Sequence, residues 1–475
     1  MRHDAIVIGS DEDGIAAALT AASAGLDVLL VDLLEARGGR PVMPGSELSS
    51  LLHKTVLEIH AAHRVLGRET TGPKLRALFG RIFARRRDEA VRFHFASLRE
   101  RLAAAGVRMA TGRPRFVSPT EVEVAPGDVR QAAIIIVAVG CRPRRPRRLL
   151  LDDRIVCDPD SILAGSSVPR SLVVIGADIV GCEFSCIFAA LGSQVTLVER
   201  RRRLLRFVDP ELREVLHERM QRMGVTVVLE ESVEDLRRVG AGADAHALVT
   251  LGSGRTEVCD RVLIAAGGVP NTRSLGLDLA GVASDARGFV VVDDHHRTSQ
   301  AGVYATGRVV DALAPSGALG HQGRMAVLDA IGADIDASGE IPLVILTVPE
   351  IATVGLTQEA CEHLGVGAFS ASAPLGRVLR ARIRGEDDGL LKLVVASETL
   401  KVLGVHVVGI SASEIVNLGA ALLRRGCSLA DFANTTFSAG SLCGAYRSAA
   451  VEALGRRIAT RAPALPSPDG DAGRW

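Results

Sequence analysis

The sequence predicts a three-layer α/β protein with two Rossmann-like dinucleotide-binding domains, followed by a C-terminal α+β domain. Three observations support this fold class. One order of strand, glycine turn, helix, strand and acidic residue occurs twice, and each copy is completed later by an apolar strand that ends at glycine. Beyond about residue 342 the pattern changes to strands followed by a helix.

The first copy of the repeat begins near the N-terminus. Residues 4–9 form a short apolar run that ends at Gly9, and residues 14–25 have the Ala-rich composition of a helix. Residues 27–32 form a second apolar run, which ends at Asp32. This order is the opening of a dinucleotide-binding βαβ unit.

The same order returns in the middle of the chain. Residues 171–176 and 194–199 are strand-like, and a helix is predicted between them over 181–192. Glu199 follows Gly176 by 23 residues, the interval that also separates Asp32 from Gly9. One copy could arise by chance, but two copies with identical spacing predict two nucleotide-binding domains.

Later segments complete these domains and add a third. Apolar runs over 132–140, 261–267 and 302–307 each end at a glycine. Residues 51–106 and 319–331 are predicted to be helical. In the C-terminal part, strands are expected over 390–395 and 402–408 and a helix over 411–424, which predicts an α+β domain.

Composition excludes several classes of protein. The net charge is +1, which gives no support to nucleic-acid or membrane-surface binding. The Arg-rich run 142–148 lacks interleaved aromatic residues, and the chain holds one Trp and two Tyr. The apolar stretches are too short to span a bilayer, and the N-terminus does not resemble a secretory signal. We therefore expect a cytoplasmic protein that binds neither nucleic acid nor membrane.

The eight cysteines are scattered, and no pair has CxxC spacing. Cys182 and Cys186 lie four residues apart, on one face of the second predicted helix. They are either a thiol pair or metal site, or two small buried apolar residues, and the second interpretation is favoured. We expect no metal site, because no cluster has suitable ligand spacing.

A series of local motifs runs through the chain at 158–163, 176–184, 347–355, 403–406, 434–437 and 445–447. In this order they resemble the flavin-dependent pyridine nucleotide oxidoreductases, the superfamily of lipoamide dehydrogenase, glutathione reductase and mercuric reductase. Within it, the chain most resembles the soluble pyridine nucleotide transhydrogenases. The resemblance covers about residues 4–457.

The resemblance implies a glutathione-reductase-like fold of four parts with a disordered tail. These are an FAD-binding domain, first part (1–150), an NAD(P)-binding domain (151–270), the FAD-binding domain, second part (271–340), a dimerisation domain (341–457) and the tail (458–475). It also implies nicotinamide dinucleotides as partners and a homodimer formed through the C-terminal domain.

The redox centre of the superfamily is missing from the matching stretch. Where the superfamily has two cysteines and a Pro-Ser-Lys, this chain has Pro41, Ser46 and Ser50. Thiol–disulfide exchange needs a thiolate, so dithiol chemistry is excluded. The C-terminal acid–base pair reads Ala439 and Gly444, and we assign no catalytic residue. Hydride transfer between nicotinamide and flavin requires none, because the cofactors carry the chemistry.

The resemblance places the cofactor contacts at two sets of positions, for FAD and NAD(P). The FAD side comprises Gly9, Asp11, Gly14, Asp32, Arg37, Gly38, Gly39, Gly140, Gly307 and Arg308. The NAD(P) side comprises Gly176, Asp178, Gly181, Glu199, Arg200 and Gly267.

Both glycine turns carry an aspartate in place of the second glycine, which lets the backbone approach the pyrophosphate. Asp11 and Asp178 add bulk and negative charge there. Two like charges at about 4 Å repel by about 4 kcal/mol at an effective dielectric near 20, which weakens binding roughly a thousandfold. Glu12 and Asp13 add acids at the first helix N-terminus, where they act as substitutes for the phosphate. Whether FAD binds therefore stays open.

One further change concerns the Gly-Asp whose carboxylate holds the flavin's ribityl chain in the superfamily. It reads Gly307-Arg308 in this chain. Since the resemblance places both Asp11 and Arg308 near the pyrophosphate end of the FAD site, we hypothesise that they form an ion pair. The alternative is two independent changes, with Arg308 reaching a phosphate.

The coenzyme preference also stays open. Asp32 and Glu199 are placed for ribose hydroxyls, and an acid there favours NAD over NADP because it repels a 2′-phosphate. However, Arg200–Arg203 follow at once and could grip that phosphate. The alternative is a solvated surface run.

Three functions remain possible. The first is an FAD-dependent oxidoreductase of transhydrogenase type, moving hydride from NADPH to NAD⁺ through flavin. The second is a flavin-free, non-catalytic relative, either a dimeric scaffold or a nucleotide sensor, which Asp11, Asp178, Ser50 and Arg308 favour. The third is an NAD(P)H-dependent reductase of a quinone or another small acceptor. The resemblance favours the first.

Overall fold

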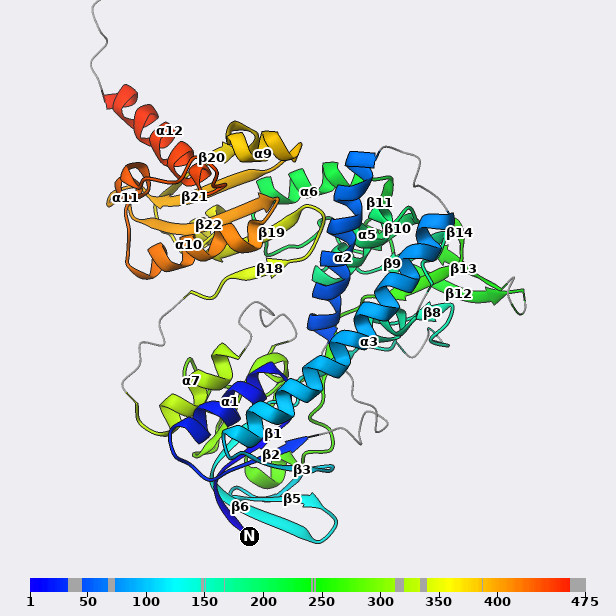
Figure 1. Ribbon diagram of the computed structural model, residues 1–475, viewed down its shortest axis with the longest axis vertical. Helices are drawn as coiled ribbons and strands as arrows, with labels where there is room; N and C mark the ends of the chain where they lie inside the picture. Colours follow the sequence, from blue (N-terminus) through cyan, green and yellow to red (C-terminus); the bar gives the residue numbers. More distant parts are fainter. Residues whose placement is uncertain are drawn as a thin grey trace, which may run out of the picture. The chain divides into compact units, whose positions relative to one another are not determined.

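The computed structural model describes residues 1–32, 45–66, 73–146, 149, 151–165, 167–240, 242, 245–311, 320–333, 340–386 and 388–461. The chain divides into two compact units (Figure 1). The first unit comprises Met1–Phe207, His217–Gly339 and Ile345–Val348. The second, called the C-terminal unit, comprises Val208–Leu216, Glu340–Val344 and Pro349–Trp475.

The first βαβ domain is built on a sheet whose central strands are parallel. Its strands are β1 (Arg2–Ile8), β2 (Val28–Asp32), β3 (Arg108–Thr111), β4 (Arg115–Ser118), β5 (Glu121–Ala125), β6 (Asp128–Val137) and β17 (Val303–Ala305). Their order is β3-β2-β1-β6-β5-β4, with β17 beside β6. Strand β1 runs parallel to β2 and β6, whereas β5 is antiparallel to β4 and β6.

Three layers result from the alternation of side chains along β1. Ala5 and Val7 pack against the helices α1 (Glu12–Ser23), α3 (Pro73–Ala104) and α7 (His321–Ala330). Ile6 and Ile8 pack on the other face, with β4, β5 and the 3₁₀ helix η4 (Leu277–Ala280). Helices α1 and α7 lie side by side (Figure 1). A Cβ added to Gly323 of α7 would come within 1.9 Å of the Asp13 carbonyl oxygen.

The second βαβ domain repeats this plan. Its parallel sheet has the order β11-β10-β9-β15-β8, and a separate antiparallel sheet has the order β12-β13-β14. The bounds are β8 (Val156–Cys157), α4 (Pro159–Ala164), β9 (Ser171–Ile175), α5 (Ile179–Ala190), β10 (Gln194–Glu199), α6 (Pro210–Arg222), β11 (Val225–Leu229), β12 (Val233–Val239), β13 (His246–Leu251), β14 (Thr256–Cys259) and β15 (Arg261–Ile264). The remaining elements of the unit are α2 (Gly45–Leu66), β7 (Cys141–Pro143), β16 (Gly268–Pro270) and η5 (Gly307–Val309).

The C-terminal unit is an antiparallel sheet covered by helices. The sheet has the order β18-β19-β22-β21-β20. Its elements are β18 (Leu343–Ile345), β19 (Glu350–Gly355), α8 (Gln358–His363), β20 (Ala368–Pro374), η7 (Leu375–Arg377), α9 (Leu379–Arg384), β21 (Leu390–Ala396), β22 (Val402–Gly409), α10 (Ala412–Arg424), α11 (Leu429–Asn434) and α12 (Gly444–Arg461). Its core includes Tyr446, whose hydroxyl donates to the Ile415 carbonyl at 2.7 Å and accepts from the Gly419 amide at 3.1 Å.

The predicted fold class is confirmed, with three local differences. Helix α1 begins at Glu12, before the predicted start at residue 14, because Asp11 caps it. Helix α12 runs to Arg461, inside the range 458–475 assigned to the tail, whose disorder stays a prediction, and residues 462–475 lie outside the described part. Val208–Leu216 groups with the C-terminal unit, although it lies inside the range 151–270.

Candidate functional site

The first glycine turn follows β1 and is sterically fixed. Gly9 has a φ of 110°, and a Cβ there would lie 2.0 Å from the Ala138 carbonyl oxygen. A Cβ at Gly14 would lie 2.1 Å from the Gly9 carbonyl oxygen. Only glycine fits at either position, so the strand, turn and helix approach one another as closely as a dinucleotide-binding turn requires.

The amides at the start of α1 are met by an acid of the turn itself. Asp11 is the N-cap of α1, and its Oδ1 accepts the Gly14 amide at 2.9 Å. Such amides are the donors that a helix N-terminus offers to a phosphate. The Asp11 carboxylate therefore accepts the hydrogen bond of the Gly14 amide, a donor of the kind that binds the diphosphate of a dinucleotide.

Asp13 lies in the first turn of α1 and caps a second helix. Its Oδ1 accepts the Gly323 amide of α7 at 3.0 Å, and the Gln322 amide also bonds to this carboxyl group. Burial raises the pKa of Asp13, and these two amides partly offset the increase. Gln322 in turn accepts the Gly307 amide at 2.7 Å. Sequence reasoning noted Asp13 only as an acid of α1, because the contact with α7 is long-range.

The carboxylates of Asp11 and Asp13 lie beside the glycines that follow the strands β6 and β17. A Cβ at Gly307 would be 2.9 Å from Asp13 Oδ2 and 3.4 Å from Asp11 Oδ2. A Cβ at Gly140 would be 3.5 Å from Asp11 Oδ2. Three predicted FAD-side residues, Asp11, Gly140 and Gly307, therefore lie close together. The Asp13 carboxylate lies beside them.

Arg308 follows Gly307 and is exposed. Among the described residues, the ion pairs within 4.0 Å do not include one between Asp11 and Arg308, so the structure does not support the hypothesis of a direct pair. The charge of Arg308 acts instead on Cys141, whose thiol pKa is raised mainly by burial, and on Glu183.

Several predicted FAD-side positions cannot be placed. Arg37, Gly38, Gly39 and Pro41 lie outside the described residues. Asp32 ends β2 as predicted, but its side chain is outside the described part, as is that of Ser46.

The second glycine turn has the same steric basis as the first. Gly176 has a φ of 102°, and a Cβ there would lie 2.5 Å from the Ala265 carbonyl oxygen. A Cβ at Gly181 would lie 1.8 Å from the Gly176 carbonyl oxygen. Gly267 follows β15 in a left-handed conformation, with a φ of 86° and open space around it.

Glu199 ends β10 and organises this second turn. It is buried, and its carboxylate accepts the Ala177 amide at 2.8 Å and the Arg201 amide at 3.0 Å. The acid therefore holds the glycine turn against the start of the Arg run.

Asp178 forms an ion pair with Arg201. It occupies the N-cap position of α5 without a capping hydrogen bond, and Arg201 lies 3.3 Å from its Oδ2. The Arg run thus divides into residues with different surroundings. Arg200 is exposed, Arg201 pairs with Asp178, and Arg202 pairs with Glu230 at the surface at 3.3 Å. Sequence reasoning weighed the run as a whole and missed this pair.

Glu183 is a buried acid that sequence reasoning did not single out. It lies on α5, and its Oε1 accepts the Leu346 amide at 2.7 Å. Burial raises the pKa of Glu183 to about 7, against the opposing effects of this amide and of Arg308. An acid within the apolar sequence Cys182–Phe184 was the signal that could have identified it.

The segment Ile345–Val348 is held against α2 and α5 around Glu183. His53 Nε2 lies 3.0 Å from the Thr347 carbonyl oxygen, and the Val348 amide bonds to Cys186. Cys182 and Cys186 are free and fully buried, and burial raises the pKa of Cys186 to about 12. They are buried apolar residues, as the favoured interpretation expected. The part of the chain that the structure describes holds no group of three or more metal-ligating side chains.

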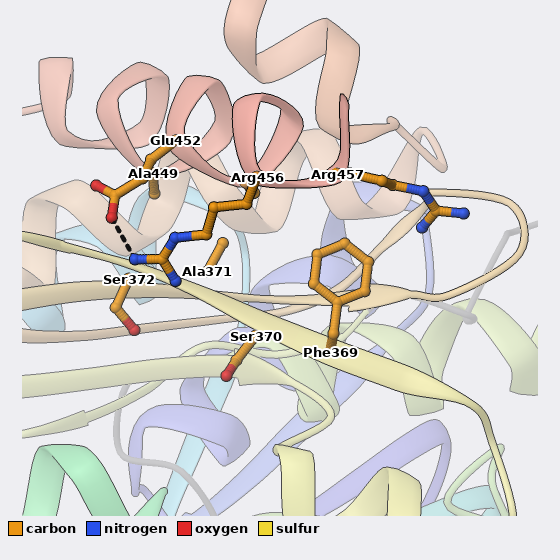
Figure 2. Close-up of a pocket in the computed structure, with 9 residues that line it drawn as sticks. Phe369, Ser370, Ala371, Ser372, Ala449, Glu452, Arg456 and Arg457 are labelled. Carbon is orange, nitrogen blue, oxygen red and sulfur yellow. Dashed lines mark hydrogen bonds and ion pairs between the residues drawn. The ribbon is translucent and has the colours of Figure 1, made fainter. Parts of the chain in front are cut away.

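A pocket of about 370 Å³ opens elsewhere, on the C-terminal unit between β20 and α12 (Figure 2). Its lining includes Phe369, Ser370 and Ser372 from β20. From α12 come Glu452 and Arg456, which pair at 2.5 Å across one helical turn. None of the predicted cofactor residues lines this pocket.

Comparisons with known proteins agree with this geometry. The family model for pyridine nucleotide-disulphide oxidoreductase matches residues 3–331, and the model for the dimerisation domain of that family matches residues 341–450. Among the described residues, no helix has the length and apolar character needed to cross a membrane.

Two sets of relatives share nearly the full length. A soluble pyridine nucleotide transhydrogenase of Mycobacterium bovis is 32% identical over 469 residues, covering 96% of this chain and 97% of the relative. One from Pseudomonas putida is 34% identical, covering 96% and 98%. The crystal structure of LpdA from Mycobacterium tuberculosis has a TM-score of 0.82 at 25% identity, covering 95% and 99%. The flavoprotein disulfide reductase RclA from Escherichia coli, at 22% identity and a TM-score of 0.80 over 94% of this chain and 99% of its own, shares the fold.

Proposed function

Because this chain belongs to the pyridine nucleotide-disulphide oxidoreductase family, whose members depend on FAD and NAD(P), we propose that it exchanges hydride between NADPH and NAD⁺ through FAD, without a redox disulfide. The observation that carries the proposal is the second glycine turn, where Arg201 neutralises Asp178 and Glu199 orders the loop. The relatives named as transhydrogenases support the same reaction.

The first glycine turn fits the backbone path of a dinucleotide. Gly9 and Gly14 let the strand, turn and helix pack closely, and Gly140 and Gly307 leave a cradle beside them that a side chain would narrow. The carboxylates of Asp11 and Asp13 lie in this cradle and oppose a diphosphate. FAD would therefore be held through the glycines and the helix N-termini, and against the charge of these acids.

When bound, FAD would supply the hydride-transfer chemistry, and the chain's own residues would position the two dinucleotides. In the second domain, the turn at Gly176 lets the backbone approach the diphosphate. Glu199 is already occupied by two amides, so it is less available to a ribose hydroxyl, and exposed Arg200 lies next to it for a 2′-phosphate. We propose that this arrangement admits NADP(H) as well as NAD(H).

The C-terminal domain supports a homodimer, since its match is to a dimerisation domain. We propose that the protein acts as a homodimer and is cytoplasmic, as its relatives named soluble suggest.

A flavin-free relative is the second candidate function. Asp13 favours it, because a buried carboxylate lies where the cofactor's donors should be free. A purified protein that remained colourless with excess FAD would support this candidate.

The proposed activity is tested by the visible absorption spectrum and a transhydrogenase assay. We expect a bound-flavin spectrum approaching one FAD per chain when the cofactor is in excess. We also expect transfer of hydride from NADPH to a thio-analogue of NAD⁺, unaffected by thiol-blocking reagents because the reaction uses no dithiol. Loss of transfer after thiol blocking, or flavin uptake without any transfer, would contradict the proposal.

Removing Arg201 should weaken nicotinamide dinucleotide binding. In Arg201→Ala the charge of Asp178 would face the diphosphate unpaired, and we expect the Kd for NADPH to rise about tenfold after allowance for solvent screening. Arg222→Ala is the matched control, because Arg222 lies outside the Arg run and pairs with exposed Glu218 on α6, and its Kd should not change. The double variant Arg201→Ala/Asp178→Gly should recover affinity. A double variant as weak as Arg201→Ala would show that Arg201 contacts the ligand itself.

A further inference from the structure

Asp13 lies between two helices, α1 and α7, whose N-termini both lie at the predicted flavin site. Its main chain belongs to the first turn of α1, and its carboxyl group accepts amides at the first turn of α7. Its second oxygen, Oδ2, lies 2.9 Å from where a Gly307 Cβ would be. One carboxylate therefore bridges the N-termini of α1 and α7 and covers the glycine between them.

The partners of this carboxylate are amides. Among the described residues, Gly323 and Gln322 are its hydrogen-bond partners, and no ion pair within 4.0 Å involves Asp13. The charged or titratable groups on the neighbouring elements are Asp11 and Glu12 at the start of α1, Arg308 of η5, Cys141 of β7, and His321 and Arg324 of α7.

Backbone amides at a helix N-terminus bind an anion, whether it comes from a ligand or from the chain. Asp13 supplies that anion from the chain. A flavin dinucleotide entering the same cradle brings its own negative charge, so the carboxylate and the cofactor compete for one set of donors.

We propose that Asp13 is an internal substitute for the anionic cofactor, and that the protein takes up FAD together with one proton, which neutralises the Asp13 carboxylate. The inference rests on the proposed function, because it concerns how the flavin site is loaded. No bond other than the O–H bond on Asp13 is made, and solvent supplies the proton.

The direction of the pH dependence follows from this coupling. Burial raises the pKa of Asp13, so the neutral form is reached at a higher pH than for an exposed aspartate. FAD affinity should rise as the pH falls towards that pKa, by at most about tenfold per pH unit for one coupled proton, and should level off below it.

The test is a titration of flavin-depleted protein with FAD between pH 5.5 and 8.5, followed by quenching of flavin fluorescence. The variants are wild type, Asp13→Asn and Asp13→Gly, with Asp278→Asn as an exposed aspartate control from the same domain. Asparagine retains an oxygen for the Gly323 amide and removes the charge. Circular dichroism at each pH establishes that every variant is folded.

We expect Asp13→Asn to bind FAD at least tenfold more tightly than wild type at pH 8 and to lose most of the pH dependence. Asp13→Gly should behave in the same way, and Asp278→Asn should match wild type. FAD binding of equal strength in wild type and Asp13→Asn, with equal pH dependence, would overturn the Asp13 inference and leave the proposed function standing. Absence of binding by Asp13→Asn alone would also overturn the Asp13 inference, whereas absence of FAD binding by wild type and every variant at every pH would overturn both.

Discussion

Replacing Lys392 with methionine should destabilise the C-terminal unit by about 3–5 kcal/mol, because it leaves a buried carboxylate without its cation. Lys392 Nζ lies 2.9 Å from Asp209 Oδ1 and 3.1 Å from Glu211 Oε2. The side chains of Lys392 and Asp209 are 8% and 0% exposed. Asp209 Oδ1 also accepts the Glu211 amide at 3.0 Å, whereas Oδ2 is buried without a hydrogen-bond partner among the described residues, so Lys392 supplies the positive charge that balances this carboxylate.

The change is measured as the shift of the urea midpoint in circular dichroism, converted with the observed m-value. Lys401→Met is the matched control, because Lys401 is exposed, and its midpoint should move little. The double variant Lys392→Met/Asp209→Leu should recover most of the loss, since an apolar pair can replace a buried ion pair. Equal midpoints for Lys392→Met and Lys401→Met would show that the buried pair contributes nothing measurable.

The glycine turns were predictable from sequence because their requirement is local and steric. Gly9 and Gly14 admit no Cβ, and the same holds for Gly176 and Gly181 in the second copy. A helix and two strands packed this closely leave one residue type at each position, so the motif and its spacing are preserved in the chain. For that reason the two βαβ domains, their order and their first helices followed from the sequence.

The partners of the acids were not predictable, because they depend on contacts between distant segments. Asp11 and Asp178 occupy equivalent places in the two repeats, yet Asp11 caps its helix and Asp178 pairs with Arg201. Asp13 bonds to Gly323, more than 300 residues later. The sequence indicated which positions of the glycine turns carry acids, but the partners of Asp11, Asp13 and Asp178 are determined by the fold.

Replacing Glu183 with glutamine should stabilise the first unit at pH 8 by up to about 3 kcal/mol. The pKa of this carboxyl group is raised by burial from its ordinary value of 4.5 to about 7. Below about pH 4.5 the group is protonated in both folded and unfolded chains, and it contributes no pH dependence. Between pH 4.5 and pH 7 the carboxyl group ionises in the unfolded chain but stays protonated in the folded one, so the free energy of unfolding falls as the pH rises. The total loss is about 1.4 kcal/mol per unit of pKa difference, and it persists above pH 7.

Glutamine stays neutral and retains an oxygen for the Leu346 amide, so Glu183→Gln removes this loss. The measurement is the free energy of unfolding of both proteins from pH 5 to 8.5, with exposed Glu234→Gln from the same domain as the control. The gain should be largest above pH 7 and shrink towards pH 5, and Glu234→Gln should show neither change. If Glu183→Gln were less stable than wild type at pH 8, Glu183 would have to be ionised in the folded protein. Arg308, whose charge already acts on Glu183, would then be the stabilising cation, and that result would place a charged pair beside the proposed flavin site.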